Sequence, residues 1–203
     1  MYAFCNCTSL TSITIPDSVT EIEYQAFYNC TSLTSIIIPN SVNEIGMEAF
    51  KGCTGELIID SNALGLYGGQ FTKVTIGDSV TSIGESAFRG CSSLTSVTIP
   101  DSVTSIGSYA FFNCPLTRVD ISDLSAWCKI SFGNNLASPL DNGAKLYLNG
   151  SELTDITIPS DITEIKDYAF EGCTSLTSIT IGNSVTTIGE RAFLYCTSLK
   201  EVY

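Results

Sequence analysis

The unit Ala-Phe-x-x-Cys occurs seven times in this chain, and each copy is followed by an apolar run of the Leu-x-x-Ile-x-Ile type. Four of the six intervals between copies are 23 residues long, and the other two are 38 and 59. A period of about 20 to 50 residues indicates a stack of supersecondary units that bury a shared core. The chain is therefore predicted to fold as a solenoid. The copies begin at Ala3, Ala26, Ala49, Ala87, Ala110, Ala169 and Ala192.

One complete repeat, residues 87–109, shows how each coil is built. Val97–Ile99 alternates apolar and polar side chains, as a half-buried strand does. Pro100–Ser102 supplies turn residues, because proline presets its φ angle and aspartate bonds nearby backbone amides. Val103 and Ile106 then return to the interior. The Ala-Phe-x-x-Cys unit is predicted to form a helical or turn-like segment on the side opposite the strand.

Superposition of the coils places the phenylalanines and cysteines of the repeat in columns. The phenylalanine column is interpreted as core packing rather than a ligand box, because every coil contains it. Seven of the nine cysteines share one repeat position, where they are predicted to act as buried thiols. A disulfide somewhere, involving Cys5 or Cys128, stays open as the alternative.

Two segments, near residues 54–78 and 115–155, interrupt the 23-residue repeat. The first contains two strand-like runs, Glu56–Ile59 and Lys73–Ile76, joined by a link with Gly65, Gly68 and Gly69. The second contains Trp127, the only tryptophan. It ends in Asn149-Gly150, which predicts a hairpin turn. Residues 1–203 are predicted to form one domain of about nine coils. Both ends of the chain fall inside a repeat, so a fragment of a larger protein is expected.

The composition excludes several functions. The net charge of −12 disfavours nucleic acid and anionic lipid as partners. The chain has no histidine, which excludes Ser-His-Asp and Cys-His catalysis. No apolar run reaches the length of a membrane span of about 18 residues. We therefore predict a protein that is not an enzyme and needs no cofactor.

A column of aspartates follows the predicted strands. Asp17, Asp78 and Asp101 share this repeat position, and Asp78 and Asp101 lie on adjacent coils. Stacked carboxylates are able to hold Ca²⁺. Asn40 and Asn183 occupy the same position elsewhere, and asparagine keeps turn bonding without the charge. We therefore predict turn capping and no metal site.

The pattern Cys-x-Ser-Leu-x-Ser-Ile-x-Ile-Pro-x-Ser-Val-x-x-Ile-Gly-x-x-Ala-Phe, seen over Cys7–Phe27 and Cys91–Phe111, closely resembles the BspA-like class of leucine-rich repeats. This resemblance implies a right-handed leucine-rich-repeat coil, with a parallel β-sheet on one face and short helical or turn segments on the other. Members are typically bacterial secreted or surface-attached proteins implicated in adhesion. The resemblance thus implies an extracellular or cell-surface module that binds another protein, such as host matrix or another cell's surface.

The candidate binding surface is the exposed face of the strands, where threonine and serine predominate. Deviations from that consensus are the candidate partner contacts, and the competing interpretation is an ordinary exposed side chain. A structural spacer and a glycan-binding segment at residues 122–145 are the alternative functions. In the glycan alternative Trp127 stacks on a sugar, whereas its other interpretation is to cover the core. The candidate contacts are Ile37, Ile58, Lys73, Arg118, Asp120 and Trp127.

Overall fold

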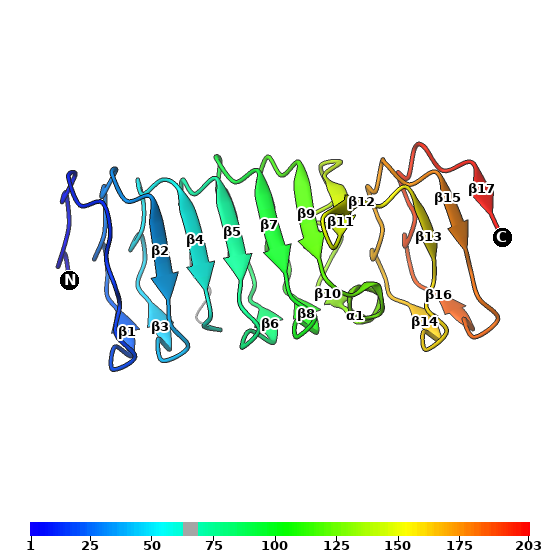
Figure 1. Cartoon of the computed structure of the whole chain (residues 1–203), viewed down its shortest axis with the longest axis horizontal. Coiled ribbons are helices and arrows are strands. Elements are labelled where there is room, and N and C mark those ends of the chain that lie inside the picture. The colour runs from blue at the N-terminus through cyan, green and yellow to red at the C-terminus, as the bar shows by residue number, and fades with distance from the viewer. Residues whose placement is uncertain (63–68) are drawn as a thin grey trace.

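The computed structural model describes residues 1–62 and 69–203. Gly65 and Gly68, two glycines of the expected link, lie outside the described residues. The chain is an elongated solenoid whose two termini lie at opposite ends (Figure 1). The fold class expected from the repeats is confirmed.

The main sheet contains seven strands, in the order β12-β11-β9-β7-β5-β4-β2, and all neighbours are parallel except β12 with β11. The strands are β2 (Ser35–Ile38), β4 (Glu56–Ile59), β5 (Lys73–Ile76), β7 (Ser96–Ile99), β9 (Arg118–Ile121), β11 (Lys145–Leu148) and β12 (Ser151–Glu152). A second parallel sheet continues the stack with β13 (Asp155–Thr157), β15 (Ser178–Thr180) and β17 (Glu201–Val202).

Two-residue strands form a further layer of the coil (Figure 1). They pair in three small parallel sheets. They are β1 (Glu21–Ile22), β3 (Glu44–Ile45), β6 (Ser82–Ile83), β8 (Ser105–Ile106), β10 (Ser131–Phe132), β14 (Glu164–Ile165) and β16 (Thr187–Ile188). Five of them, β3, β6, β8, β14 and β16, come directly after the turn that follows a main strand, whereas β10 comes after helix α1 (Leu124–Lys129).

The Ala-Phe-x-x-Cys units form turns and not helices. In each copy, the residue before alanine and the residue before cysteine have positive φ angles, for example Tyr109 at 59° and Asn113 at 63°. A left-handed residue on each side of Ala110-Phe111 prevents a right-handed helix from propagating. The described part of the chain contains a single α-helix, α1 (Leu124–Lys129), in the non-repeating segment. In residues 1–62 and 69–203, no helix has the length and apolarity needed to cross a bilayer.

The phenylalanine column is the core of the solenoid, as expected. Phenylalanine rings of adjacent coils stack nearly parallel, and each pair fills the space between two turns. The centroid separations are 5.1 Å for Phe4–Phe27, 5.2 Å for Phe27–Phe50, 5.1 Å for Phe88–Phe111 and 5.3 Å for Phe170–Phe193. The column therefore links the coils through one continuous apolar interior.

None of the nine cysteines, all of which lie in the described part of the chain, forms a disulfide, which answers the open alternative. Thiols of the repeat donate to the carbonyl oxygen of the phenylalanine in the preceding coil. These S···O distances are 3.0 Å for Cys30–Phe4, 3.0 Å for Cys53–Phe27, 2.9 Å for Cys114–Phe88 and 3.1 Å for Cys196–Phe170. Each of these carbonyl oxygens also accepts the N–H of the cysteine in its own turn, so the thiol adds a second hydrogen bond that comes from the next coil.

The predicted hairpin at Asn149-Gly150 is confirmed, and it changes the count of coils. Asn149 and Gly150 have φ angles of 50° and 81°, as a two-residue hairpin turn requires. Tyr147 and Glu152 are direct antiparallel partners. Because β13 starts shortly after β12, the hairpin adds strands without completing a coil. The chain winds about eight turns, so the expectation of about nine was one too high.

Candidate functional site on the exposed face of the sheet

The exposed face of the seven-stranded sheet carries two rows of side chains, which we call the sheet face. Register pairing aligns each row across six parallel strands. The first row is Ser35, Glu56, Lys73, Ser96, Arg118 and Lys145. The second row is Ile37, Ile58, Thr75, Thr98, Asp120 and Tyr147. Side chains between the rows point into the core, because strand residues alternate between faces.

One end of the sheet face is apolar. Ile37 and Ile58 are direct cross-strand partners on β2 and β4, and Ile37 is 55% exposed. Beside them, Lys73 Nζ lies 2.7 Å from Glu56 Oε1 across β4 and β5. Thr75 donates to the same Glu56 oxygen at 3.4 Å. The structure therefore brings Ile37, Ile58 and Lys73, all predicted contacts, onto one continuous patch.

The other end of the sheet face is built around Arg118. Its guanidinium donates two hydrogen bonds to Asp120, with Nε–Oδ2 at 2.7 Å and Nη2–Oδ1 at 2.6 Å. It also lies 3.9 Å from the centroid of the Tyr147 ring. The bonded carboxylate raises the pKa of Arg118. This pairing of Arg118 with Asp120 fixes both predicted residues on β9 in one geometry.

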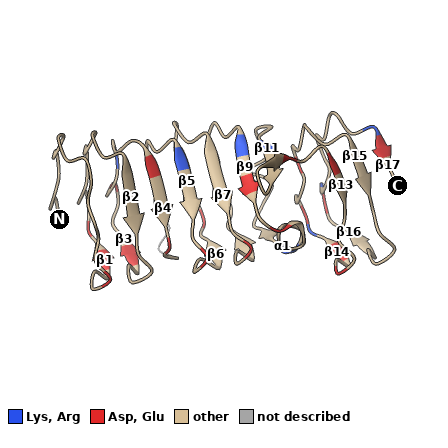
Figure 2. Cartoon of the chain, viewed as in Figure 1, with Lys and Arg blue, Asp and Glu red and all other residues tan. Residues whose placement is uncertain are grey.

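The hairpin extends this second cluster. Lys145 Nζ lies 3.0 Å from Glu152 Oε1, and Tyr147 donates to Glu152 Oε2 at 3.4 Å. The hydrogen bond to Glu152 raises the pKa of Lys145. Figure 2 marks the basic positions of β5 and β9 in blue on the main sheet. Every charge of the two rows is therefore paired with an opposite charge, which for Lys145 comes from Glu152 on the neighbouring β12.

Four residues of the sheet face were missed in the sequence. Glu56, Lys145, Tyr147 and Glu152 complete the two clusters. Glu56 and Lys145 occupy the same strand position as Lys73, and aligning the apolar residues of the strands would have placed both there. Glu152 follows the hairpin turn, so only the pairing of β11 with β12 brings it to the face.

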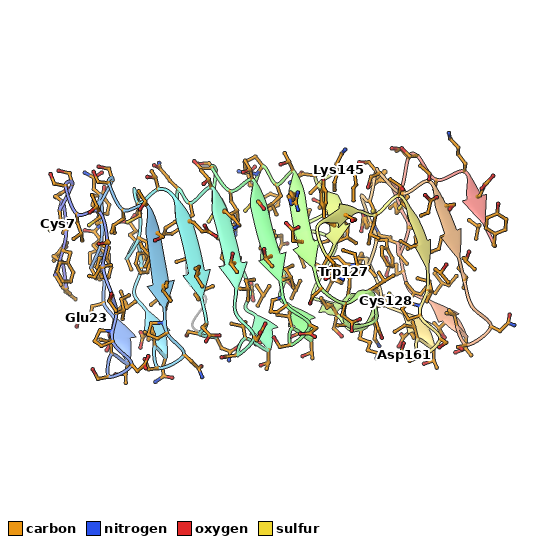
Figure 3. All side chains as sticks on the ribbon, viewed as in Figure 1. Cys7, Glu23, Trp127, Cys128, Lys145 and Asp161 are labelled. Carbon is orange, nitrogen blue, oxygen red and sulfur yellow. The ribbon has the colours of Figure 1, made fainter. Side chains whose placement is uncertain are left out.

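Trp127 does not belong to an exposed site: the expectation that it contacts a partner or a sugar was wrong, and the other interpretation, that it covers the core, is confirmed. Its side chain is 1% exposed, and its indole N–H donates to the carbonyl of Ala169 at 3.0 Å. Its ring meets Phe132 edge to face, 5.7 Å between centroids. Trp127 and Cys128 lie within the body of the solenoid (Figure 3). Since α1 spans an irregular coil, its apolar face closes the core there, and no sugar reaches the ring.

The turns after the strands are closed by the backbone. Val103 N–H donates to Pro100 O at 3.3 Å, and Val19 N–H donates to Pro16 O at 2.9 Å. The aspartate in each of these turns is exposed. Among the residues that the structure describes, no group of three or more His, Cys, Asp or Glu side chains is arranged to hold a metal ion.

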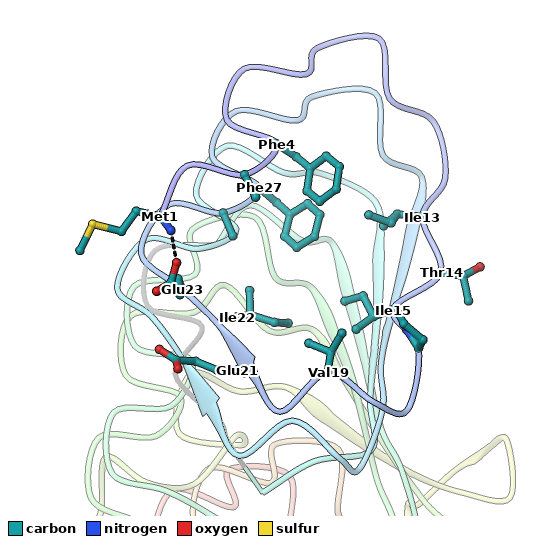
Figure 4. A pocket seen from close by; sticks show the side chains of 13 residues that line it. Met1, Phe4, Ile13, Thr14, Ile15, Val19, Glu21, Ile22, Glu23 and Phe27 are labelled. Carbon is teal, nitrogen blue, oxygen red and sulfur yellow. Dashed lines mark hydrogen bonds and ion pairs between the residues drawn. The ribbon is translucent and has the colours of Figure 1, made fainter.

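An apolar hollow of about 330 Å³ lies at the N-terminal end of the coil (Figure 4). Phe4, Phe27, Ile15 and Ile22 line it, and the N-terminal amine of Met1 pairs with Glu23 at its rim. These residues are the same columns that pack between coils elsewhere. The hollow is therefore the end of the solenoid core, where the core residues of the first coils line a surface recess.

Comparison with known proteins identifies the repeat. A family described as "BspA type Leucine rich repeat region" matches in 6 copies, over residues 1–65, 57–138 and 143–203. No curated protein matches the chain.

Several solved structures are similar. A leucine-rich cell surface protein from Faecalibacterium prausnitzii is 31% identical, with a TM-score of 0.47, over 95% of this chain and 60% of that one. A leucine-rich repeat protein from Bacteroides ovatus is 33% identical, with a TM-score of 0.49, over 99% and 51%. The pneumococcal vaccine antigen PcpA is 20% identical, with a TM-score of 0.46, over 95% and 58%. The chain thus spans 60% or less of the length of each of these three proteins. By the match to the family over nearly all of its length, the chain belongs to the BspA-type leucine-rich repeat family.

Proposed function

We propose that this chain is a non-catalytic protein-binding module, and that it binds its partner through the sheet face. The observation that carries the proposal is the gathering of the non-consensus side chains into two clusters in register on one face. The setting that we propose is the bacterial cell surface, with adhesion to an extracellular protein as the outcome.

The chemistry of the two clusters supports a protein partner. Arginine and tyrosine dominate the binding energy of many protein interfaces, especially where their side chains are preorganised. Arg118 is held by Asp120 and stacked on Tyr147, so little side-chain entropy is lost on binding. Ile37 presents an exposed apolar contact at the other end. From β4 to β11 the face spans about 19 Å at 4.8 Å per strand, which suits a folded partner.

The experiment is binding of the chain to immobilised extracellular matrix proteins and glycans, with the double variant Lys73→Ser and Arg118→Thr beside the wild type. We expect saturable binding to at least one protein, weakened about 10-fold or more in the double variant because two interface contacts are lost. Lys51→Ser is the matched control. Lys51 forms an ion pair of similar length, 2.6 Å with Glu48, in an Ala-Phe-x-x-Cys turn away from the sheet.

Three outcomes would contradict the proposal. Equal weakening by Lys51→Ser would mean that general charge, and not the sheet face, governs binding. Unchanged protein binding in the double variant would show that the partner binds outside the sheet face. Binding to no protein on the panel would favour the alternative of a structural spacer.

A further inference from the structure

A groove of about 440 Å³ lies where three strands of the main sheet end. It begins beside Asp78 after β5, crosses Pro100 after β7 and Ile121 at the end of β9, and stops against the hairpin turn at Asn149 and Gly150. Thr75, Thr98 and Asp120 of the sheet face also line it. We call it the strand-exit groove. It is continuous with the proposed binding surface.

The hairpin wall of the groove is held in place by hydrogen bonds. Asn149 N–H donates to Ile121 O at 3.0 Å, and Asn149 Nδ2 donates to Ser122 O at 3.3 Å. Both bonds join the turn to the end of β9. Because the backbone of the wall is tied to the sheet on which the groove lies, the groove is a preformed feature of the fold.

Apolar surface and one uncompensated carboxylate share the lining. Pro100 and the core isoleucines Ile76, Ile99 and Ile121 lie beneath the groove as a buried apolar floor, and the half-buried Thr75 and Thr98 flank that floor. The carboxylate of Asp120 is compensated by Arg118. Asp78 is exposed, and no described lysine or arginine lies within ion-pair distance of it.

The lining therefore fits a side chain that is long, apolar along its stem and positively charged at its tip. Lysine and arginine have this character, because their methylene stems pack on apolar surface while the charged head reaches a polar group. An acidic group would meet the Asp78 charge and the net charge of −12 of the whole chain. The same charge attracts a basic segment over a distance of about 8 to 10 Å at physiological salt.

We infer that the strand-exit groove takes a lysine or arginine side chain of the protein partner, with its stem over Pro100 and its charged head at Asp78. This inference rests on the proposed function, and it names the chemistry by which the partner is recognised. The partner thus presents a basic residue at the edge of the surface that covers the sheet face.

The test is titration of the ¹⁵N-labelled chain, followed by NMR, with the blocked tripeptide Gly-Lys-Gly and with Gly-Gln-Gly at matched salt. We expect the lysine peptide to shift the amides of Gly77, Thr98 and Asn149, and the glutamine peptide to shift them much less. Asp78→Asn should weaken the lysine titration several-fold. Asp17→Asn is the matched control, because Asp17 has the same repeat position and is exposed, yet it does not line this groove.

The opposite results would overturn the inference. Equal shifts with the glutamine peptide would show that the cation is not recognised. Equal loss in Asp17→Asn and Asp78→Asn would show diffuse attraction to an acidic surface. The spectrum of each variant without peptide shows whether it is folded, so a loss through misfolding is recognised.

This inference and the proposed function fail separately. If a protein of the panel binds and only Lys73→Ser with Arg118→Thr weakens it, while Asp78→Asn does not, the sheet face is the site and the groove inference is wrong. If Asp78→Asn weakens the same protein several-fold, the inference is supported. Selective lysine binding with no protein partner on the panel would instead contradict the proposed function and leave the groove as a basic-residue site.

Discussion

The thiol of Cys53 donates a hydrogen bond to the main-chain carbonyl of Phe27 in the preceding coil, with an S···O distance of 3.0 Å. The same relationship recurs along the stack. Cysteine at this position is therefore both a small apolar group and a donor that ties one coil to the next.

Thiol labelling should separate the cysteines by their place in the stack. At pH 8, Cys7, which is exposed, and Cys5, which is half-buried, should react with a disulfide reagent within minutes. Cys53 and the other core thiols should react only on unfolding. Cys196 is also half-buried, but burial raises its pKa to about 12, so it should react slowly. Fast reaction of most thiols in the native state would contradict this packing.

The buried thiols also predict a loss of stability in alkali. Burial raises the pKa of Cys53 and Cys128 to about 12 and that of Cys173 to about 11, against about 8.5 in an unfolded chain. A group whose pKa is raised on folding stabilises fully below its unfolded pKa and loses this contribution as pH rises towards the folded pKa. The free energy of unfolding should therefore fall between about pH 8.5 and 11. Cys53→Ala should reduce that fall, which urea titrations at several pH values would show.

Trp127→Ala should destabilise the chain by about 3 to 5 kcal/mol, as truncation of a buried tryptophan generally does. The indole loses its packing and the hydrogen bond to Ala169, both inside the core. Trp127→Phe should cost less, because it keeps most of the ring. Chemical unfolding followed by circular dichroism measures both. A change below about 1 kcal/mol in the alanine variant would be inconsistent with a buried Trp127.

Gly172→Ala and Gly90→Ala form a matched pair at the same repeat position. Both glycines have positive φ angles, 78° and 71°, so each alanine should cost about 1 to 2 kcal/mol through backbone strain. At Gly172 a Cβ would also clash with the carbonyl oxygen of Leu140, whereas at Gly90 nothing lies within 4 Å. Gly172→Ala should thus cost more, by about 1 to 3 kcal/mol in unfolding experiments. Equal costs would mean that residues near Leu140 do not pack as described.

Glu171 predicts a specific pH dependence in mild acid. Its side chain is fully buried, and burial raises the pKa of its carboxyl although Arg191 donates to it at 3.0 Å and opposes the shift. The contribution of Glu171 to stability is therefore full below its unfolded pKa of about 4.3 and is lost as pH rises through the folded pKa.

The variant Glu171→Gln isolates this contribution, because it removes the titration and keeps the shape of the side chain. Relative to Glu171→Gln, the wild type should lose stability as pH rises above about 4.3. Thermal unfolding of both proteins from pH 4 to 7 makes the comparison. Parallel curves for the two proteins would contradict a raised pKa.

The repeating part of the fold was predictable because its information is local and periodic. Residues 23 positions apart, such as Phe27 and Phe50, stack directly above one another. The interpretation of one repeat therefore predicted the position of every phenylalanine in the column. Strand alternation around Val97 and the hairpin at Asn149-Gly150 depend equally on neighbouring residues. For the Ala-Phe-x-x-Cys units the sequence left a helical and a turn-like segment open, because left-handed residues such as Tyr109 carry no strong sequence signal, and the structure shows turns.

The site depended on contacts between segments that share no period. Glu56 pairs with Lys73 only because a shortened coil still aligns Leu57 with Val74. Arg118, which bonds Asp120 within its own strand, meets Tyr147 only because β9 and β11 pair in register. The burial of Trp127 depends on a distant segment in the same way. Helix α1 directs its ring towards Ala169, which lies 42 positions further along the chain. The sequence by itself thus determines the solenoid, because its apolar side chains recur at the positions that each coil buries. The charge pairs that join different strands, such as Lys73 with Glu56, are set by distances that exist only after the coils have packed.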